Sequence, residues 1–435
     1  MSIQAPALGV NAGTPARVGF AVHIRHWAGE SAVLIALADA DAATSGGKAA
    51  VLARLLRAGL PVPPGFVVPT TAYEQAVAGL DLTGLDTARR FVERVPLSPA
   101  LTDAISRALV RLAGPSAEAY VAVRSSAAGE DTATASAAGQ YDTFLGVRGP
   151  DRVAQAVRGC WASLWSARAV QYRRRTADTP ATAATTAVLV QRLVDADVSG
   201  VLFTGPQVRI EASWGLGESV VGGRVTPDSW VISGDTVTHR SLGGKHERVD
   251  RADTGLVTRA VPPPDRYRFC LADDDLHRLA RLGRQAAELL GGPQDVEWAI
   301  ADDRIWLLQA RPITAAVPAA ARCAASGTTL TGTPGSSGVA AGPARLVHGP
   351  ADFGRVRAGD VLVCRTTDPA WTPLFGVVAA VVTETGGLLS HAAIVAREQG
   401  LPAVLAVADA MTVLPDGAPV EVDGSTGRIV IAAAR

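Results

Sequence analysis

Apolar residues along the first two thirds of the chain recur in two spacings, one helical and one strand-like. In the segment 47–60 they recur at helical spacing, which predicts an amphipathic helix. Two more helices are predicted at 70–78 and 99–112. Short apolar runs predict strands at 33–37, 66–68, 120–124, 187–191, 200–204, 208–212, 229–233, 297–301 and 304–309. Helices and strands mixed over about 280 residues indicate an α/β or α+β catalytic unit.

This pattern stops at 313–332, where small residues replace the periodic apolar ones. We interpret the stretch as an interdomain linker, because a structureless surface loop of about 20 residues within one domain is uncommon. The predicted organisation is a loose lead-in over 1–29, a first domain over 30–315, a linker over 316–330 and a second domain over 331–435. In the second domain a helix is predicted to start at Ser390, and strands are predicted at 344–347, 361–364, 379–383, 403–407 and 427–431.

The composition is that of a packed protein with balanced charge. Hydrophobic residues make up 48% of the chain and charged residues 19%, and 41 basic and 41 acidic residues give a formal net charge of +0. This balance argues against a general nucleic-acid binder or a membrane-surface protein. No apolar run of about 18 residues occurs and residues 1–20 lack the charged-then-apolar order of a signal peptide, so neither a membrane span nor a signal peptide is expected here. Four scattered cysteines without a CxxC pair are expected to be reduced and mostly buried, so we expect a cytoplasmic protein.

Lysine occurs only twice, at Lys48 and Lys245, and arginine supplies every other basic residue. Lys48 leads directly into an apolar helical pattern, which makes it a candidate phosphate ligand, because a compact ammonium differs from a planar guanidinium. Lys245 opens the charged stretch KHERVDR, and we expect it to be a solvated lysine.

The segment TETGGLLSHAAIVAREQGLPAV, residues 383–404, carries the strongest chemical signal. Ser390 is a good helix N-cap, which places His391 in the first helical turn, where free backbone N–H groups favour an anion. An imidazole with a pKa of about 6.5 is largely neutral at pH 7 and therefore nucleophilic. A phosphoryl group carried on His391 is the interpretation that we favour. A structural histidine or a metal ligand is the alternative, although no second histidine stands at ligand spacing.

This segment closely resembles the phosphohistidine segment of the PEP-utilising family, which includes pyruvate phosphate dikinase, phosphoenolpyruvate synthase and the rifampicin phosphotransferases. The resemblance implies that His391 is the residue that becomes phosphorylated. Three further stretches fit the same family: GTPGSSGVAAGPARLV at 332–347, RTTDPAWTPLF at 365–375 and DGSTGRIVI at 423–431. The implied fold is an ATP-grasp nucleotide-binding domain followed by a small swivelling phosphohistidine domain.

The first domain is similar to the nucleotide-binding domain of that family over three blocks, 45–68, 121–147 and 189–205. The resemblance makes Lys48 and Arg124 phosphate ligands and places a small-residue loop that ends at Gly139 over the phosphates. It places Gln191 and Val194 at the edge of the adenine. The Gly-Lys at 47–48 is not a Walker A loop, since Ala49 follows where that motif needs Ser or Thr.

Two later blocks complete the predicted nucleotide site. In IEASWGLGESVVGG, Glu218 is expected to face the nucleotide, and Glu211 is either part of the cleft or a structural salt-bridge partner. In QDVEWAIADDRIWLLQARPIT a turn at 301–303 is predicted to bring Glu297 and Gln309 side by side. A carboxylate and an amide oxygen suit Mg²⁺ that bridges phosphates. Arg311, two residues beyond Gln309, would project from the same face and stabilise the transferring phosphoryl group.

The resemblance implies an ATP-dependent phosphotransferase of the dikinase type that gives AMP and phosphate, with ATP and Mg²⁺ as ligands. Dikinases of the family continue into a PEP/pyruvate barrel, whereas this sequence ends at Arg435, and the drug-binding insertion of the rifampicin enzymes is replaced by the linker. We therefore expect a small-molecule acceptor bound between the domains, or a partner subunit that carries the acceptor site. The alternatives are a ligase-like enzyme that condenses two substrates and an ATP-binding sensor without turnover.

Overall fold

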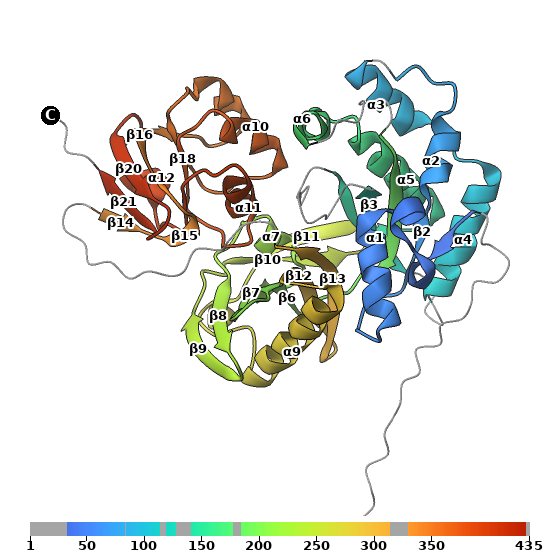
Figure 1. Cartoon of the computed structure of the whole chain (residues 1–435), viewed down its shortest axis with the longest axis horizontal. Helices are drawn as coiled ribbons and strands as arrows, with labels where there is room; N and C mark the ends of the chain where they lie inside the picture. Colours follow the sequence, from blue (N-terminus) through green and yellow to red (C-terminus); the bar gives the residue numbers. More distant parts are fainter. Residues whose placement is uncertain are drawn as a thin grey trace, which may run out of the picture.

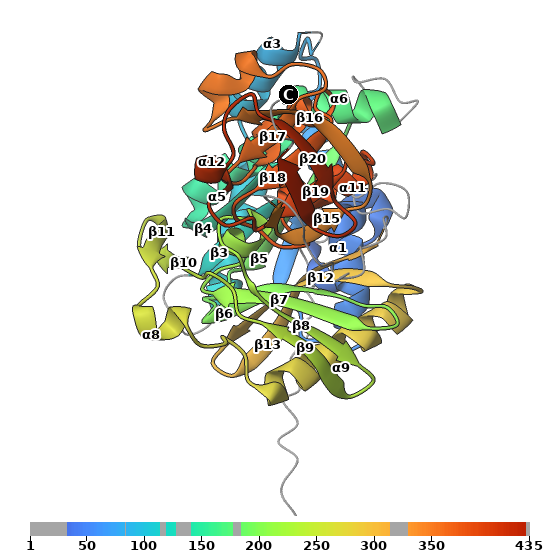
Figure 2. The same cartoon turned by 90° about the vertical axis from the view of Figure 1, so that its left-hand side faces the viewer.

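The computed structural model describes residues 33–82, 84–113, 119–127, 141–176, 184–313 and 329–431. Three large sheets with their helices and a separate two-stranded hairpin make up this part of the chain, and each large sheet occupies its own region in Figure 1. The view turned by 90° places the third sheet above the second (Figure 2). The predicted lead-in and residues 316–328 of the predicted linker lie outside the described residues.

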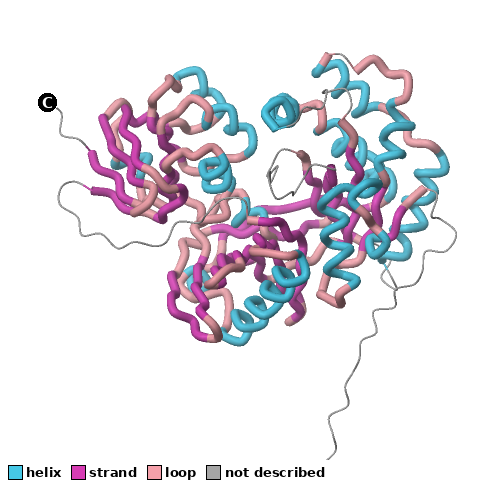
Figure 3. Tube along the Cα trace, in the orientation of Figure 1, coloured by secondary structure: helices cyan, strands magenta, loops and turns pink. Residues whose placement is uncertain are grey.

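The first sheet is antiparallel, with five strands in the order β1-β2-β5-β3-β4. Its strands are β1 (Ile35–Ala36), β2 (Gly65–Val68), β3 (Tyr120–Ala127), β4 (Thr143–Arg148) and β5 (Thr186–Arg192). Alternate residues of β5 enter two different cores, as expected of a sheet covered on both faces. Most of the helices that Figure 3 shows in cyan at the upper right cover one of these faces. They are α2 (Thr70–Val77), α3 (Leu85–Arg94), α4 (Pro99–Ala113) and α5 (Pro150–Ser163), and α6 (Ala167–Thr176) follows them in the chain.

Helix α1 (Ala42–Arg57) packs against the other face of the first sheet, within a core shared with the second sheet. Asp41 caps it by accepting hydrogen bonds from the backbone N–H groups of Ala43 and Thr44. Gly46 interrupts the helix with a φ of 75°, and a Cβ there would overlap the Ser126 carbonyl of β3. This close approach, which only glycine permits, brings the next turn of α1 and its Lys48 against β3.

The second sheet is also antiparallel, with six strands in the order β13-β12-β6-β7-β8-β9. They are β6 (Val198–Phe203), β7 (Val208–Trp214), β8 (Asp228–Ser233), β9 (Thr236–Ser241), β12 (Gln294–Ala301) and β13 (Arg304–Pro312). Apolar side chains of one face share a core with the buried side of α9 (Asp273–Leu290). A separate hairpin pairs β10 (Glu247–Ala252) with β11 (Gly255–Ala260), and two short helices, α7 (Glu218–Val221) and α8 (Pro263–Arg266), lie in the connections.

The third sheet has eight strands in the order β14-β21-β20-β16-β17-β18-β19-β15, with parallel pairing from β16 to β19. Its strands are β14 (Thr329–Thr331), β15 (Thr333–Ser336), β16 (Val339–Leu346), β17 (Val361–Cys364), β18 (Ala380–Thr383), β19 (Ala403–Leu405), β20 (Pro419–Asp423) and β21 (Arg428–Ile431). Its helices are α10 (Thr372–Phe375), α11 (His391–Glu398) and α12 (Ala410–Val413). Helix α11 lies on the side of this unit that faces the rest of the chain (Figure 1). We call residues 329–431 the histidine unit and residues 33–313 the nucleotide unit.

Most predicted strands are present, but several expectations need correction. The strand predicted at 33–37 is reduced to β1, because a 3-10 helix over Leu37–Asp39 follows it. The helix predicted at 47–60 begins earlier, after the Asp41 cap, and ends before Gly59, whose φ of 82° stops it. Strand β14 begins within the predicted linker. Helices α3, α5, α6 and α9 were not predicted.

Lys245 is not the solvated lysine that its charged neighbours suggest. Its side chain is fully buried and forms an ion pair with Asp228, which also accepts hydrogen bonds from the backbone N–H groups of Gly243 and Cys270. The prediction of buried, reduced thiols is confirmed for Cys160, Cys270 and Cys364, whereas Cys323 lies outside the described residues. None of the helices in the described part of the chain is long and apolar enough to cross a membrane.

Candidate active site

A β-bulge aligns the two residues predicted to hold Mg²⁺. Asp302 and Asp303 form the turn between β12 and β13, and both have positive φ. From this turn the residues of β12 and β13 pair one to one as far as Trp298, which lies opposite Leu307. The next pair joins Glu297 to Gln309, so Leu308 is an extra residue. Without the bulge Gln309 would share the core-facing side of Leu307. The bulge therefore turns Gln309 to the same face as Glu297, as the sequence predicted for this pair.

The same face of the second sheet carries Arg311 and Asp295, which lie opposite each other two residues beyond the pair Glu297–Gln309. Both the Nε and an Nη of Arg311 donate to Asp295 Oδ2, at 2.8 and 2.7 Å. Burial raises the pKa of Asp295 in spite of this partner. Asp295 thus fixes the orientation of Arg311, and the sequence reasoning missed it, because a carboxylate two residues before Glu297 has no motif of its own.

Arg124 and Lys48 approach this face from the first sheet and from α1. Arg124 donates to the carbonyl of the bulge residue Leu308 at 2.9 Å and to Glu297 Oε2 at 3.2 Å. The buried Lys48 donates through Nζ to the Ser125 carbonyl at 3.1 Å. The site is therefore assembled across two sheets, with the bulge itself anchoring Arg124.

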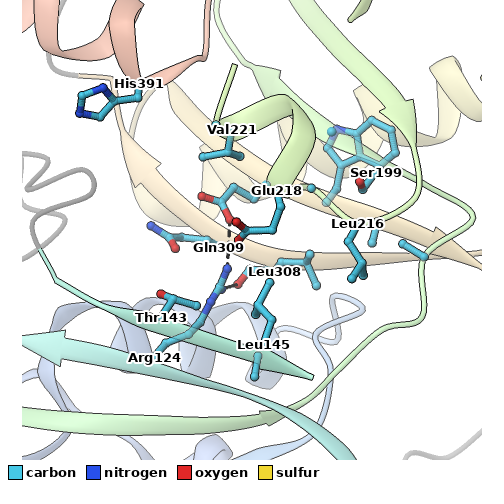
Figure 4. Close-up of a pocket in the computed structure, with 18 of the residues that line it drawn as sticks. Arg124, Thr143, Leu145, Ser199, Leu216, Glu218, Val221, Leu308, Gln309 and His391 are labelled. Atoms are coloured by element: carbon cyan, nitrogen blue, oxygen red, sulfur yellow. Dashed lines mark hydrogen bonds and ion pairs between the residues drawn. The ribbon is translucent and has the colours of Figure 1, made fainter. Parts of the chain in front are cut away.

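The predicted nucleotide residues line one cleft of about 660 Å³. Figure 4 shows Arg124 on one side of the cleft and His391 on the opposite side, with Glu218 and Gln309 between them. Burial raises the pKa of Glu218, and the Glu297 charge adds to the shift. The predicted residues that line this cleft are Lys48, Arg124, Gln191, Val194, Glu218, Glu297, Gln309, Arg311 and His391. Gly139, the end of the predicted phosphate loop, lies outside the described residues.

The end of the cleft predicted to receive adenine is formed by β5 and the segment that follows it. Gln191 is buried and donates through Nε2 to the Pro63 carbonyl at 2.9 Å. Val194 belongs to a small apolar cluster with Leu216 and Trp306. An apolar wall beside backbone and amide groups is what a purine base requires.

His391 is the first residue of α11, and the residue as a whole is 7% exposed. Ser390 occupies the N-cap position as predicted, although its hydroxyl donates to the Gly387 carbonyl and caps no backbone N–H. Thr367 Oγ1 shares a hydrogen bond of 2.8 Å with His391 Nδ1, and Thr372 Oγ1 lies 3.3 Å from Nε2. Burial lowers the pKa of His391 to about 4, with the Arg168 charge as a second cause, so the ring is neutral at pH 7. The two threonines belong to the segment RTTDPAWTPLF, but nothing in that segment indicates which hydroxyls reach the ring.

The histidine unit rests on the nucleotide unit through hydrogen bonds and apolar contacts. Thr366 and Thr385 donate to the carbonyls of Gly222 and Gly223, at 3.0 and 2.7 Å. Leu388 and Leu389 pack on Val201 and Phe203 of β6. These contacts hold α11 with His391 on the wall of the nucleotide cleft.

The fold and this cleft define a nucleotide-binding unit of the ATP-grasp type, joined to a smaller unit that presents a histidine. Residues 82–327 match the family of the pyruvate phosphate dikinase AMP/ATP-binding domain, and residues 356–427 match the mobile domain of PEP-utilising enzymes. The chain therefore belongs to the pyruvate phosphate dikinase family of PEP-utilising enzymes.

Curated relatives match nearly the whole chain but are longer than it is. A probable phosphoenolpyruvate synthase of Methanothermobacter thermautotrophicus is 36% identical over 422 residues, which cover 89% of this chain and 61% of the relative. A probable phosphoenolpyruvate synthase of Archaeoglobus fulgidus is 36% identical over 88% of this chain and 55% of the relative. The phosphoenolpyruvate synthase of Pyrococcus furiosus is 34% identical over 90% of this chain and 57% of the relative. The chain thus spans little more than half the length of these relatives.

Proposed function

We propose that this chain is an ATP-dependent phosphotransferase of the dikinase type, in which His391 accepts a phosphoryl group from ATP and passes it to an acceptor. The observation that carries the proposal is the position of His391, a buried neutral imidazole on the wall of the cleft that also contains Lys48, Arg124 and Arg311. A neutral ring nitrogen has the lone pair that attack on phosphorus requires. Membership of the family supports the same chemistry.

In the proposed reaction three cations bind the phosphates, while Gln191 and Val194 contact the base. The bond between a ring nitrogen of His391 and the β-phosphorus forms as the bond to the α-phosphate oxygen breaks, and the electron pair leaves with AMP. Water then attacks the γ-phosphorus of the resulting pyrophosphohistidine, the bond from that phosphorus to the β–γ bridging oxygen breaks, and phosphate leaves with the β-phosphoryl group still on His391. Arg311, held by Asp295, is positioned to stabilise the charge that develops on the transferring group.

Mg²⁺ fits the donor set that this chain offers. Glu297 and Gln309 present a carboxylate and an amide oxygen side by side on the cleft face. Within the described ranges no three His, Cys, Asp or Glu residues cluster as a metal cage. A pair of protein oxygens is the donor set expected of Mg²⁺, which commonly binds one or two protein oxygens together with substrate phosphates and water. In the proposal these two residues hold the ion, which neutralises phosphate charge when bound.

For the acceptor of the phosphoryl group we propose only a chemical class. The relatives are named phosphoenolpyruvate synthases, and pyruvate would be the acceptor by that analogy. We propose that the acceptor is a small molecule bound between the domains 30–315 and 331–435, and that the second domain swivels about the linker 316–330. The alternative is that a partner subunit supplies the acceptor site. Phosphoryl transfer is favoured over condensation of two substrates, because the histidine lies on the nucleotide cleft.

The test is to find the phosphoryl group on residue 391. The purified protein is incubated with Mg²⁺ and ATP, digested at neutral pH and analysed by mass spectrometry, with His391→Gln and His348→Gln as matched variants. His348 is a second histidine of the same unit, outside the residues that line the cleft. We expect an acid-labile phosphoryl group on His391 in the native chain and in His348→Gln. Modification of any other residue, or of none while ATP is bound, would contradict the proposal.

A further inference from the structure

Glu211 is a carboxylate of the nucleotide unit that the histidine unit covers. It stands on β7, and its exposed fraction is 4%. Gln309, Glu297, Val201 and Glu211 lie opposite one another in turn across the strands β13, β12, β6 and β7. Glu211 is therefore on the cleft-facing side of the sheet. Glu211 therefore shares a face with the proposed catalytic groups, two strands away from Glu297.

The loop before α11 closes directly over this carboxylate. Leu388 donates its backbone N–H to Glu211 Oε1 at 2.9 Å. Gly387 lies so close that a Cβ there would overlap the carboxylate. Because both residues belong to the histidine unit, Glu211 is removed from water only when that unit is docked.

Few charges compensate for the burial of this carboxylate. Glu211 Oε2 is buried and has no hydrogen-bond partner among the described residues. The charged groups that act on Glu211 are Arg209 from its own strand and Arg397 from α11, and Arg397 also faces Asp295. The covering loop, residues 385–389, contributes no titratable side chain, and the opposing residues on β6 and β8 are Val201 and Ser229. A structural salt-bridge partner was one of the two roles predicted for Glu211, but no salt bridge to it forms among the described residues.

We propose that Glu211 is a positioning residue that takes up a proton when the histidine unit docks, so that the delivery of His391 to the nucleotide depends on pH. The inference rests on the proposed function for its role in catalysis, but the docking step can be observed without ATP. The proton comes from solvent and binds the carboxylate, and it returns to solvent when the unit departs.

The direction of the effect follows from the two states. Burial raises the pKa of the docked Glu211 from an ordinary 4.5 to about 7. Docking is therefore strongest at low pH and weakens as the pH rises toward 7, above which both states are ionised. From these two values the docking equilibrium constant falls about tenfold between pH 6 and pH 8. His391 has its pKa near 4 and does not titrate in this window.

A second side-chain contact between the two units provides the control. His246 Nε2 lies 3.1 Å from an Nη of Arg365, which belongs to the histidine unit. His246→Gln alters this contact between the units without touching Glu211. The contributions of the two residues to docking can therefore be separated by substitution.

The experiment measures docking by energy transfer between two dyes on the full chain, without nucleotide. Cysteines for the dyes replace the exposed Ser233 of β8 and Glu421 of β20, with Cys323 replaced by Ser. We expect transfer to decrease from pH 6 to pH 8 in the native background and in His246→Gln, and to stay high and constant in Glu211→Gln. A decrease that persists in Glu211→Gln, or that is absent from the native chain, would overturn the inference. A chain that shows this docking profile yet forms no phosphohistidine retains the inference as a docking property and loses the proposed function.

Discussion

Glu297 and Gln309 lie directly opposite each other on β12 and β13 because one extra residue, Leu308, is inserted between the pairs Trp298–Leu307 and Glu297–Gln309. The insertion turns Gln309 and Arg311 out of the core, and the Leu308 carbonyl accepts a hydrogen bond from Arg124. One irregularity in a hairpin thus orients the proposed metal ligands and anchors a proposed phosphate ligand from the other sheet.

Replacing Glu297 tests the role of this pair. Glu297→Gln keeps the shape of the side chain but removes the charge that would hold Mg²⁺ and pair with Arg124. We expect the rate of phosphohistidine formation to fall about 10²- to 10³-fold, the range typical of a lost electrostatic contact to a transition state. The rate is measured by rapid quench at saturating ATP, with the exposed Glu421→Gln as the matched control. A loss below threefold would argue against Glu297 as a metal ligand.

Replacing Gly387 tests whether docking delivers the histidine. Gly387→Ala would place a methyl group against the Glu211 carboxylate, which the unit must avoid by lifting away. We expect phosphohistidine formation to slow at least tenfold, while ATP binding measured by calorimetry is unchanged. Gly349→Ala is the control, because a Cβ at that glycine of the same unit meets open space. Equal rates for the two variants would show that close docking is not required.

The pKa of His391 predicts a second pH dependence, distinct from that of docking. The reactive form is the neutral ring, and since burial lowers its pKa to about 4, that form is fully present above about pH 5 and is lost as the pH falls through 4. In the Glu211→Gln background the rate of phosphohistidine formation should therefore be constant from pH 6 to pH 8. A decline below pH 7 with a midpoint near 6.5 would mean that the imidazole is not held in this environment.

The two lysines should differ in what their loss affects. Lys245→Met leaves Asp228 buried without its cation, and we expect the free energy of unfolding to fall by about 3–5 kcal/mol. Lys48→Met should reduce ATP affinity and phosphohistidine formation, with a much smaller loss of stability. Urea unfolding and ATP titration of both variants make the comparison. Equal destabilisation by the two substitutions would remove the distinction between a structural and a phosphate-binding lysine.

The sequence predicted the strands that carry the site because their apolar runs are short and bounded by turns, as at β5, β17 and β18. It placed Glu297, Gln309 and His391 in one site through motif and resemblance. It could not predict Asp295 or Thr367, and it left the role of Glu211 open, because these roles arise from contacts between strands or units far apart in the chain. The helices that it missed include α9, whose three leading aspartates and regular apolar spacing carry the pattern of a helix start, and α6, which is rich in arginine and lacks an apolar stripe.

Lys245 shows the limit most plainly. Its neighbours in the chain are charged, and only the fold brings Asp228, 17 residues away in the chain, into an ion pair with the buried Lys245. Burial of a charge depends on a partner, and the identity of that partner is a property of the tertiary structure.

The most direct test of the account is the fate of the ATP phosphates in the absence of an acceptor. The protein is incubated with Mg²⁺ and ATP labelled separately at the β and γ positions, with His391→Ala as the control, and AMP is followed in parallel. The account predicts β-label in an acid-labile adduct, release of AMP, and no adduct in His391→Ala. Label from the γ position alone, or an adduct that persists in His391→Ala, would contradict it.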